Sequence, residues 1–304
     1  MLQRFSRLLK TVAEKIYISP IILAFLFFLV VALAVTYPFV TSPKHTLTAP
    51  LASDTTSSVI QYEAFVREGL NPFTSTEYRL VGQPDGIPIA PGVNRVSFLS
   101  VLLLWVNSSL FGAITAHSLQ TVTGFLLTAF ITFLFVRSVT KSSAAGVVGG
   151  LIYGFWPQIL GLGRAAPTYT HMWLFILPLW AFWSLAANGL SKRRVVLAAL
   201  SVVPAIFWTP YYAFHILLVG GTCLGIASLV LYKNAGLKKT ALLIFVVLGS
   251  WFIAYGAYIV VGMTAPASEV PVRTIEEAYQ QSAHPLMYLL PGEYTHWGSA
   301  LNTA

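Results

Sequence analysis

The stretch that decides the fold is IILAFLFFLVVALAV, residues 21–35, an unbroken run of apolar side chains. Similar runs recur along the chain, and several approach the ~20 residues that a helix needs to cross a bilayer. A membrane β-barrel would instead show alternating strands of about ten residues. Because 56% of the 304 residues are hydrophobic and 9% are charged, the sequence predicts a helical protein that crosses a membrane several times.

The apolar runs predict an all-α bundle of about seven transmembrane helices. They cover residues 18–39, 113–136, 143–163, 171–189, 195–209, 212–232 and 240–262. A further run, 96–111, is ambiguous, because it is short for a span.

Basic residues between the apolar runs predict the orientation, because Lys and Arg are enriched in cytoplasmic loops. They form four clusters: Arg4, Arg7, Lys10 and Lys15; Arg137 and Lys141; Lys192, Arg193 and Arg194; Lys233, Lys238 and Lys239. With a cytoplasmic N-terminus, all four clusters stay inside only if the chain crosses the membrane once between Arg95 and Arg137. The run 96–111 is therefore predicted to be a membrane-surface or re-entrant helix. The net charge of +8 reflects these orientation signals, and no nucleic-acid partner is expected.

This topology divides the chain into five parts. They are a cytoplasmic basic N-terminus at 1–17, a first transmembrane helix at 18–39 that acts as a signal anchor, an outer loop at 40–112, a six-helix region at 113–262 and an outer polar segment at 263–304. All six histidines and every acid except Glu14 then lie on the outer side. Titratable chemistry is therefore expected at the extracytoplasmic face.

The outer loop 40–112 is too long for a simple connector, so it is expected to carry function. Ser53 or Asp54 can cap a helix that ends at Gly69. The apolar residues of that helix recur at spacings of three and four, at Val59, Tyr62 and Val66. This pattern predicts a juxtamembrane helix on the bilayer surface.

The order of these features resembles the N-terminal half of a GT-C-fold glycosyltransferase. The shared features are Asp54 soon after the first span, the GLNPF stretch at 69–73, the PDG turn at 84–86, the glycine-rich span at 149–157 and an outer connection that ends near His171. That superfamily includes protein mannosyltransferases, oligosaccharyltransferase catalytic subunits and aminoarabinose transferases, which use lipid-linked sugar donors. Its members are commonly longer, so either further spans beyond residue 304 or a compact relative is expected.

The resemblance implies a set of site residues. Asp54 matches the acid that acts as general base or holds a divalent cation, Mg²⁺ or Mn²⁺, at the donor phosphate. A carboxylate can take the proton of an acceptor hydroxyl, and the guanidinium forks of Arg79 and Arg164 match phosphate oxygens. Tyr169 and His171 are expected to assist in substrate binding, with His171 as a second metal ligand. Capping of a helix explains Asp54 equally well.

The expected function is transfer of a sugar from a polyprenyl-linked donor to a glycan, lipid or protein acceptor at the outer face of the cytoplasmic membrane. The connection 161–173 contains no acid, which leaves a metal-free or inactive site open. A non-catalytic membrane scaffold is therefore the first alternative. The second is a transporter or lipid-handling protein, although such proteins commonly show inverted repeats, and none is visible in the sequence.

Overall fold

The computed structural model describes residues 19–47, 54–80, 87–88, 94–95, 97–189, 191–209 and 212, with isolated positions at 245, 249, 252, 256 and 260. The described part is mostly helical, so the predicted all-α class is confirmed. The predicted segments 1–17 and 263–304 lie outside the described residues. So do the predicted spans 212–232 and 240–262, apart from the isolated positions.

Helix α6 (Ala113–Thr140) is the centre of the bundle and contacts α2, α3, α5, α7, α9 and the short helix η2. It begins after Gly112, whose φ of 83° suits glycine, and ends at Thr140, where the next residue, Lys141, adopts the left-handed conformation. Its 28 residues make a helix about 42 Å long. Among the described residues, α6 alone is long and apolar enough to cross a membrane by itself.

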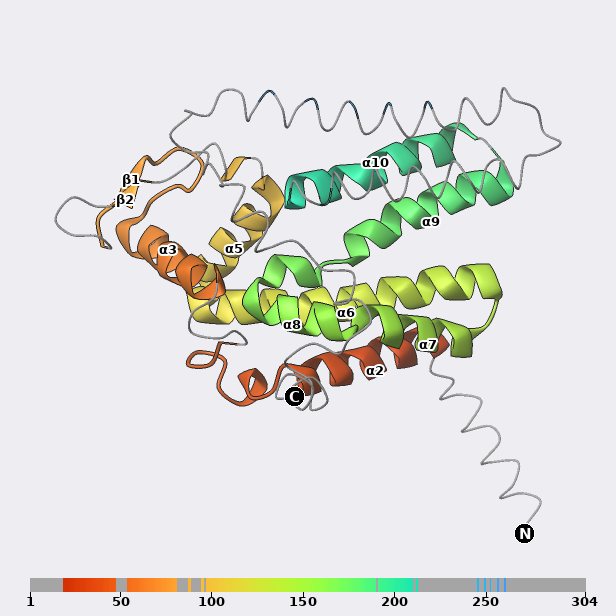
Figure 1. Cartoon of the computed structure of the whole chain (residues 1–304), viewed down its shortest axis with the longest axis horizontal. Coiled ribbons are helices and arrows are strands. Elements are labelled where there is room, and N and C mark those ends of the chain that lie inside the picture. Colours follow the sequence, from red (N-terminus) through yellow and green to blue (C-terminus); the bar gives the residue numbers. More distant parts are fainter. Residues whose placement is uncertain are drawn as a thin grey trace, which may run out of the picture.

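Helices α2 (Pro20–Val35) and α7 (Ser143–Gly154) pack along one side of α6 (Figure 1). Ser19 caps α2, and Pro20 occupies its first turn, where a missing N–H costs little. Phe28 of α2 is fully buried in a shared core with Phe125 and Phe133 of α6. Gly154 lets α7 approach α6 closely, because a Cβ there would lie 2.7 Å from the Cα of Ala129. These contacts pack α2 and α7 against α6 and, more weakly, against each other.

The predicted span 143–163 is divided into two helices. Helix α7 ends at Gly154, and α8 (Pro157–Ala165) begins after Phe155 and Trp156. Proline lacks an N–H and disfavours helical geometry in the residue before it, so the chain breaks there. The 12 residues of α7 cover about 18 Å, which is less than the ~30 Å of a bilayer core.

The next two predicted runs form a helical hairpin. Helix α8 leads through η2 (Pro167–Thr170) into α9 (Trp173–Asn188), which turns back into α10 (Lys192–Trp208). The side chain of Ser191 caps α10 by accepting a hydrogen bond from the N–H of Arg194. The core between the two helices includes Phe182, Leu185, Val202 and Ile206. α9 packs against α6, whereas α10 packs against α9 and α5.

Helix α3 (Asp54–Glu68) confirms the predicted amphipathic helix, and Gly69 follows it with a φ of 66°. Its inward face packs on α5 (Phe98–Phe111) and on the start of α6. The core there is formed by Tyr62, Phe65, Val101, Leu104 and Ala113. Strands β1 (Glu77–Tyr78) and β2 (Ile87–Pro88) form a small antiparallel hairpin, with Tyr78 opposite Ile87. The short helix η1 (Phe39–Thr41) follows α2.

The two ends of the bundle differ in charge. The start of α2, the α6–α7 turn and the α9–α10 turn lie at one end, at the right of Figure 1. Arg137, Lys141 and the Lys192–Arg194 cluster therefore gather there. Helix α3, the β-hairpin and α5 lie at the opposite end, where Glu63, Glu68 and Glu77 occur together with Arg67 and Arg79, so charges of both signs are present.

Large apolar side chains are exposed along the outer faces of four helices. They include Ile22, Leu23 and Val30 of α2, Leu103 and Leu110 of α5, Val148 and Ile152 of α7, and Val196, Leu197 and Leu200 of α10. Scattered exposed apolar residues are normal, but contiguous faces of this kind mark contact with an apolar phase or a partner.

Candidate functional site

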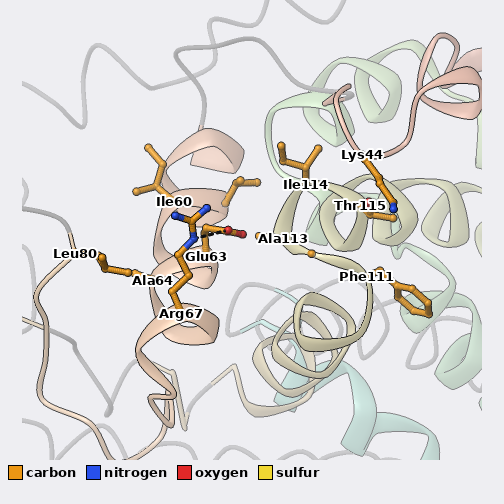
Figure 2. Close-up of a pocket in the computed structure, with 12 residues that line it drawn as sticks. Lys44, Ile60, Glu63, Ala64, Arg67, Leu80, Phe111, Ala113, Ile114 and Thr115 are labelled. Carbon is orange, nitrogen blue, oxygen red and sulfur yellow. Dashed lines mark hydrogen bonds and ion pairs between the residues drawn. The ribbon is translucent and has the colours of Figure 1, made fainter.

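A groove of about 670 Å³ opens between α3 and the α5–α6 junction. Figure 2 shows its two walls, with side chains of α3 on one side and the start of α6 on the other. We call it the α3 groove. Its lining residues are Lys44, Val59, Ile60, Glu63, Ala64, Arg67, Leu80, Phe111, Gly112, Ala113, Ile114 and Thr115.

The α3 groove combines apolar walls with cationic groups. Ile60, Leu80 and Phe111 line it although each is about half exposed, at 49%, 45% and 51%. Arg67 pairs with Glu63 at 2.8 Å, one helical turn away on α3. Since exposed pairs of this kind contribute only about 0–1 kcal/mol, the guanidinium can exchange this partner for another anion.

Lys44 is brought to the groove by two hydrogen bonds on either side of it. The hydroxyl of Thr115 donates to the carbonyl of Pro43 at 3.0 Å, and the hydroxyl of Ser118 donates to that of Thr46 at 3.2 Å. Both donors belong to the first turns of α6. Within the described part of the chain, the exposed Lys44 ammonium forms no ion pair. The rim of the groove therefore carries two cations and one carboxylate.

His171 is sealed in the bundle rather than open to the groove. It is 4% exposed. Its Nδ1 accepts the indole N–H of Trp173 at 2.9 Å, and its Nε2 lies 3.0 Å from the carbonyl oxygen of Gln120. A carbonyl can only accept, so Nε2 carries a proton. Because Nδ1 accepts a hydrogen bond, it carries none, and the ring is neutral. In this arrangement the ring has no free lone pair for a metal ion or a phosphate proton.

The segment around His171 packs against the middle of α6, although the sequence places it in an outer connection. The hydroxyl of Thr128 donates to the carbonyl of Thr170 at 2.7 Å and accepts the N–H of Trp173 at 3.0 Å. Gly124 provides the space for this contact. Tyr169, also expected at the substrate, packs against the core of α9 and α10.

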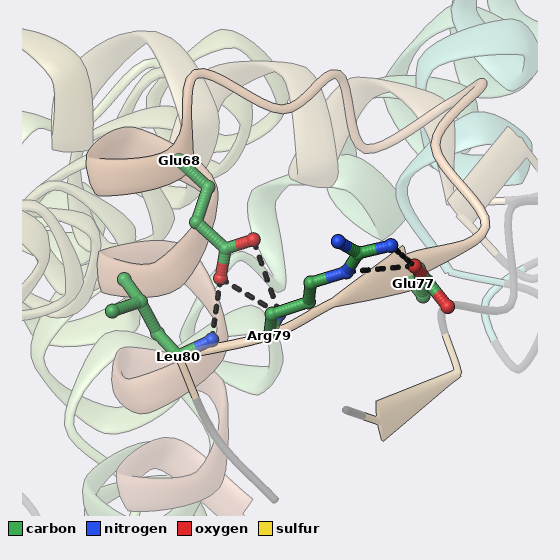
Figure 3. Close-up of polar contacts among 4 residues, drawn as sticks. All are labelled: Glu68, Glu77, Arg79 and Leu80. Carbon is green, nitrogen blue, oxygen red and sulfur yellow. Dashed lines mark hydrogen bonds and ion pairs between the residues drawn. The ribbon is translucent and has the colours of Figure 1, made fainter. Parts of the chain in front are cut away.

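Arg79 belongs to a surface hydrogen-bond network at the end of α3, shown in Figure 3. Its guanidinium, 77% exposed, donates to the carboxylate of Glu77 at 2.9 and 2.6 Å. This hydrogen bond and the charge of Glu77 raise the pKa of Arg79 further. The carboxylate of Glu68 accepts the backbone N–H groups of Arg79 and Leu80 at 2.7 to 3.0 Å. Glu68 thus ties the β-hairpin to α3, a role the sequence did not indicate.

Asp54 and Arg164 belong to helices that touch each other. Asp54 is the first residue of α3, Arg164 lies in the last turn of α8, and α3 contacts α8. The side chains of both residues lie outside the described part. Thr55, next to Asp54, is 1% exposed, so the head of α3 is packed into the bundle rather than resting on its surface.

The metal prediction stays a prediction. Among the residues that the structure describes, no group of three His, Cys, Asp or Glu side chains is close enough to hold a metal ion. Asp54 falls outside that search because its side chain is not described.

Sequence reasoning missed the residues that form the α3 groove. Lys44, Arg67 and Thr115 were not singled out, because they come from three separate segments with no shared motif. The helical periodicity of α3 could have predicted that Glu63 and Arg67 are neighbours, since residues four apart lie on the same face of a helix. Nothing in the sequence could have brought Lys44 to them.

Comparison with known protein families, curated proteins and solved structures finds no match to this chain.

Proposed function

We propose that the chain is an integral membrane protein of about seven transmembrane helices with a cytoplasmic N-terminus. The apolar side chains exposed on four helices support this proposal, because such faces suit contact with lipid. The basic turns gathered at one end of the bundle support the orientation. The α3 groove then lies at the extracytoplasmic boundary, where water meets lipid.

In this setting the protein acts as a GT-C-like glycosyltransferase that uses a polyprenyl-linked sugar donor. The observation that carries the proposal is the composition of the α3 groove. Its apolar wall suits a polyprenyl chain, while Lys44 and Arg67 suit the phosphate to which that chain is joined. A groove with both properties at the water–lipid boundary fits an amphipathic anion better than a soluble metabolite.

The transfer of the sugar needs no reactant other than the donor and the acceptor. The acceptor oxygen bonds to the anomeric carbon of the sugar, and the bond from that carbon to the phosphate oxygen breaks. The polyprenyl phosphate leaves with the bonding electron pair, and the acceptor proton passes to the carboxylate of Asp54. Lys44, Arg67 and Arg164 offset the negative charge that develops on the leaving group.

The other residues that the sequence places at the site have different roles. A divalent cation at Asp54 would supply Lewis-acid assistance to the leaving phosphate. Arg79 reaches phosphate only by releasing Glu77, which costs little on an exposed surface. His171 and Tyr169 hold the connection 161–173 in place and act as positioning residues rather than as substrate ligands.

The groove is tested by neutralising its two cations. The purified detergent-solubilised double variant Lys44→Gln and Arg67→Gln is expected to bind geranyl phosphate at least tenfold more weakly, since two charge-assisted contacts are lost. Geranyl alcohol should bind wild type and variant equally. The measurement is a titration followed by microscale thermophoresis at two salt concentrations, because the phosphate contribution is screened by salt.

The matched control for this test removes two charges from the opposite end of the bundle. Lys192→Gln and Arg193→Gln, both exposed at the start of α10, should leave geranyl phosphate affinity unchanged. Equal loss in both double variants, or equal affinity of wild type for the phosphate and the alcohol, contradicts a phosphate site in the groove.

A lipid-handling protein is the second candidate, and one observation favours it. The broken segment α8–η2 packs near Gly124 and Thr128, in the middle of α6. If α6 spans the bilayer, this unwound backbone lies at mid-membrane depth, as in many transporters. Mass spectrometry of the lipid separates the two functions. A transferase releases free polyprenyl phosphate, whereas a transporter leaves the sugar–phosphate bond intact.

A further inference from the structure

One face of α6 leads from the α3 groove into the interior. Ala113, His117, Gln120 and Gly124 are spaced by four, three and four residues, so they lie in a row on the same face. Ala113 lines the groove, and Gly124 lies against Thr170 and His171. His117 and Gln120 therefore occupy the stretch between the groove and the sealed connection.

Both of these side chains are buried without a hydrogen-bond partner. His117 is 1% and Gln120 is 5% exposed. Neither ring nitrogen of His117 and neither amide atom of Gln120 bonds to any described residue. An unsatisfied buried polar group costs about 1–3 kcal/mol, so four such atoms in adjacent turns are rare in a folded protein.

The position of Tyr62 connects this pair to the groove. Its ring contacts the imidazole of His117 edge-on, with centroids 5.8 Å apart. Tyr62 is next in sequence to groove-lining Glu63 on α3. It is itself 5% exposed, and burial raises the pKa of its phenol. Tyr62 thus forms the wall between the groove and His117.

We propose that His117 and Gln120 form a subsite for an uncharged, hydroxyl-bearing group that reaches them from the α3 groove past Tyr62. This inference rests on the proposed function and assigns the group to the sugar of the donor, with its phosphate at Lys44 and Arg67. A neutral imidazole and an amide each donate and accept, which matches the donor and acceptor capacity of sugar hydroxyls.

The charge of the surroundings selects against an ionic ligand at this subsite. In the described part of the chain, no hydrogen bond or ion pair joins His117 or Gln120 to a charged side chain. Burial of an unpaired ion is far more costly than burial of a hydroxyl that finds partners. From the described residues, we therefore expect the subsite to favour neutral sugars over uronic acids and amino sugars.

The test uses purified full-length protein in detergent and a neutral methyl hexoside as the probe. Thermal unfolding is followed with the hexoside and with glycerol at equal concentration, because polyols stabilise proteins non-specifically. Wild type is expected to gain stability from the hexoside beyond the glycerol effect. The variants Gln120→Met and His117→Phe should weaken the apparent affinity about tenfold, since each loses hydrogen bonds to the ligand.

The same variants should be as stable as wild type or more stable without ligand, because an apolar group of similar shape replaces an unsatisfied polar one. A merely structural role for either residue predicts the reverse. Gln61→Met, a matched change on half-buried Gln61 of α3, should leave the hexoside effect intact.

Three results overturn the inference. They are no hexoside effect beyond glycerol in wild type, an undiminished effect in both variants, or an equal effect from the methyl ester and the free acid of a hexuronoside. The hexoside test and the geranyl phosphate test can fail independently of each other. Specific hexoside binding that is lost in Gln120→Met would stand even if no sugar transfer is found.

Discussion

Replacing Gly124 by alanine is expected to destabilise the purified protein by about 3 kcal/mol or more, because the new methyl group has no space. A Cβ at this position would lie 2.6 Å from the Cβ of Thr170, overlap its hydroxyl and come within 2.9 Å of Cδ2 of His171. Thr170 cannot turn away, since it is fully buried and its hydroxyl donates to the carbonyl of Pro167. The segment must therefore shift away from α6.

The measurement is the thermal or denaturant unfolding of wild type and variant in the same detergent. The shift should also release the contacts of Thr128 with Thr170 and Trp173, which would appear as faster amide exchange of Trp173. Gly161→Ala in α8 is the control. A Cβ there meets nothing within 4 Å, and alanine favours a helix over glycine by about 1 kcal/mol. Equal stability of the two variants would refute the close packing of η2 on α6.

Under the proposed glycosyltransferase function, replacing Asp54 by asparagine is expected to reduce sugar transfer by about 10²- to 10⁴-fold while leaving the fold intact. The amide cannot accept the acceptor proton, which removes the contribution of a general base. Asparagine keeps a side-chain oxygen that can accept hydrogen bonds at the start of a helix, so α3 should keep its start and its contact with α8. The readout is the release of polyprenyl phosphate, together with the glycan composition of cell envelopes that carry the variant.

Asp54→Ala separates the two roles of this residue. It removes every polar atom of the side chain at the first residue of α3, so side-chain support for the free N–H groups of the first turn is lost and stability should fall by about 1 kcal/mol. If Asp54→Asn retains full transfer while Asp54→Ala lowers stability, Asp54 only supports the start of α3 and the transfer chemistry lies elsewhere.

Several local features of the fold were predictable from the sequence alone. The sequence predicted a helix from a capping residue, Ser53 or Asp54, to Gly69, and in the structure α3 runs from Asp54 to Glu68 with Gly69 directly after it. The run 143–163 was predicted as one span from its apolar composition, although proline, a residue that kinks or ends helices, lies within it. Pro157 divides that run, and its effect on the preceding residue is a local one that the sequence already contained.

The candidate site was much less predictable. Asp54, Arg79 and Arg164 were expected at the substrate because of their positions along the chain relative to the predicted spans. The α3 groove is instead lined by Lys44, Glu63 and Thr115, which no spacing relates. His171 was expected to be available for binding, but Gln120 and Trp173 hold both of its nitrogens. One of these partners is close in sequence, whereas the other comes from a different helix.

By itself, the sequence determined the helical class, the boundaries of α3 and the separation of basic turns from acidic segments. These depend on side-chain polarity and backbone preference, which act over a few residues. Only the tertiary structure decided which polar groups are sealed, which are unpartnered and which line the groove. Burial and hydrogen bonding depend on helices that are distant in the chain, and the close packing at Gly124 and Gly154 sets how they meet.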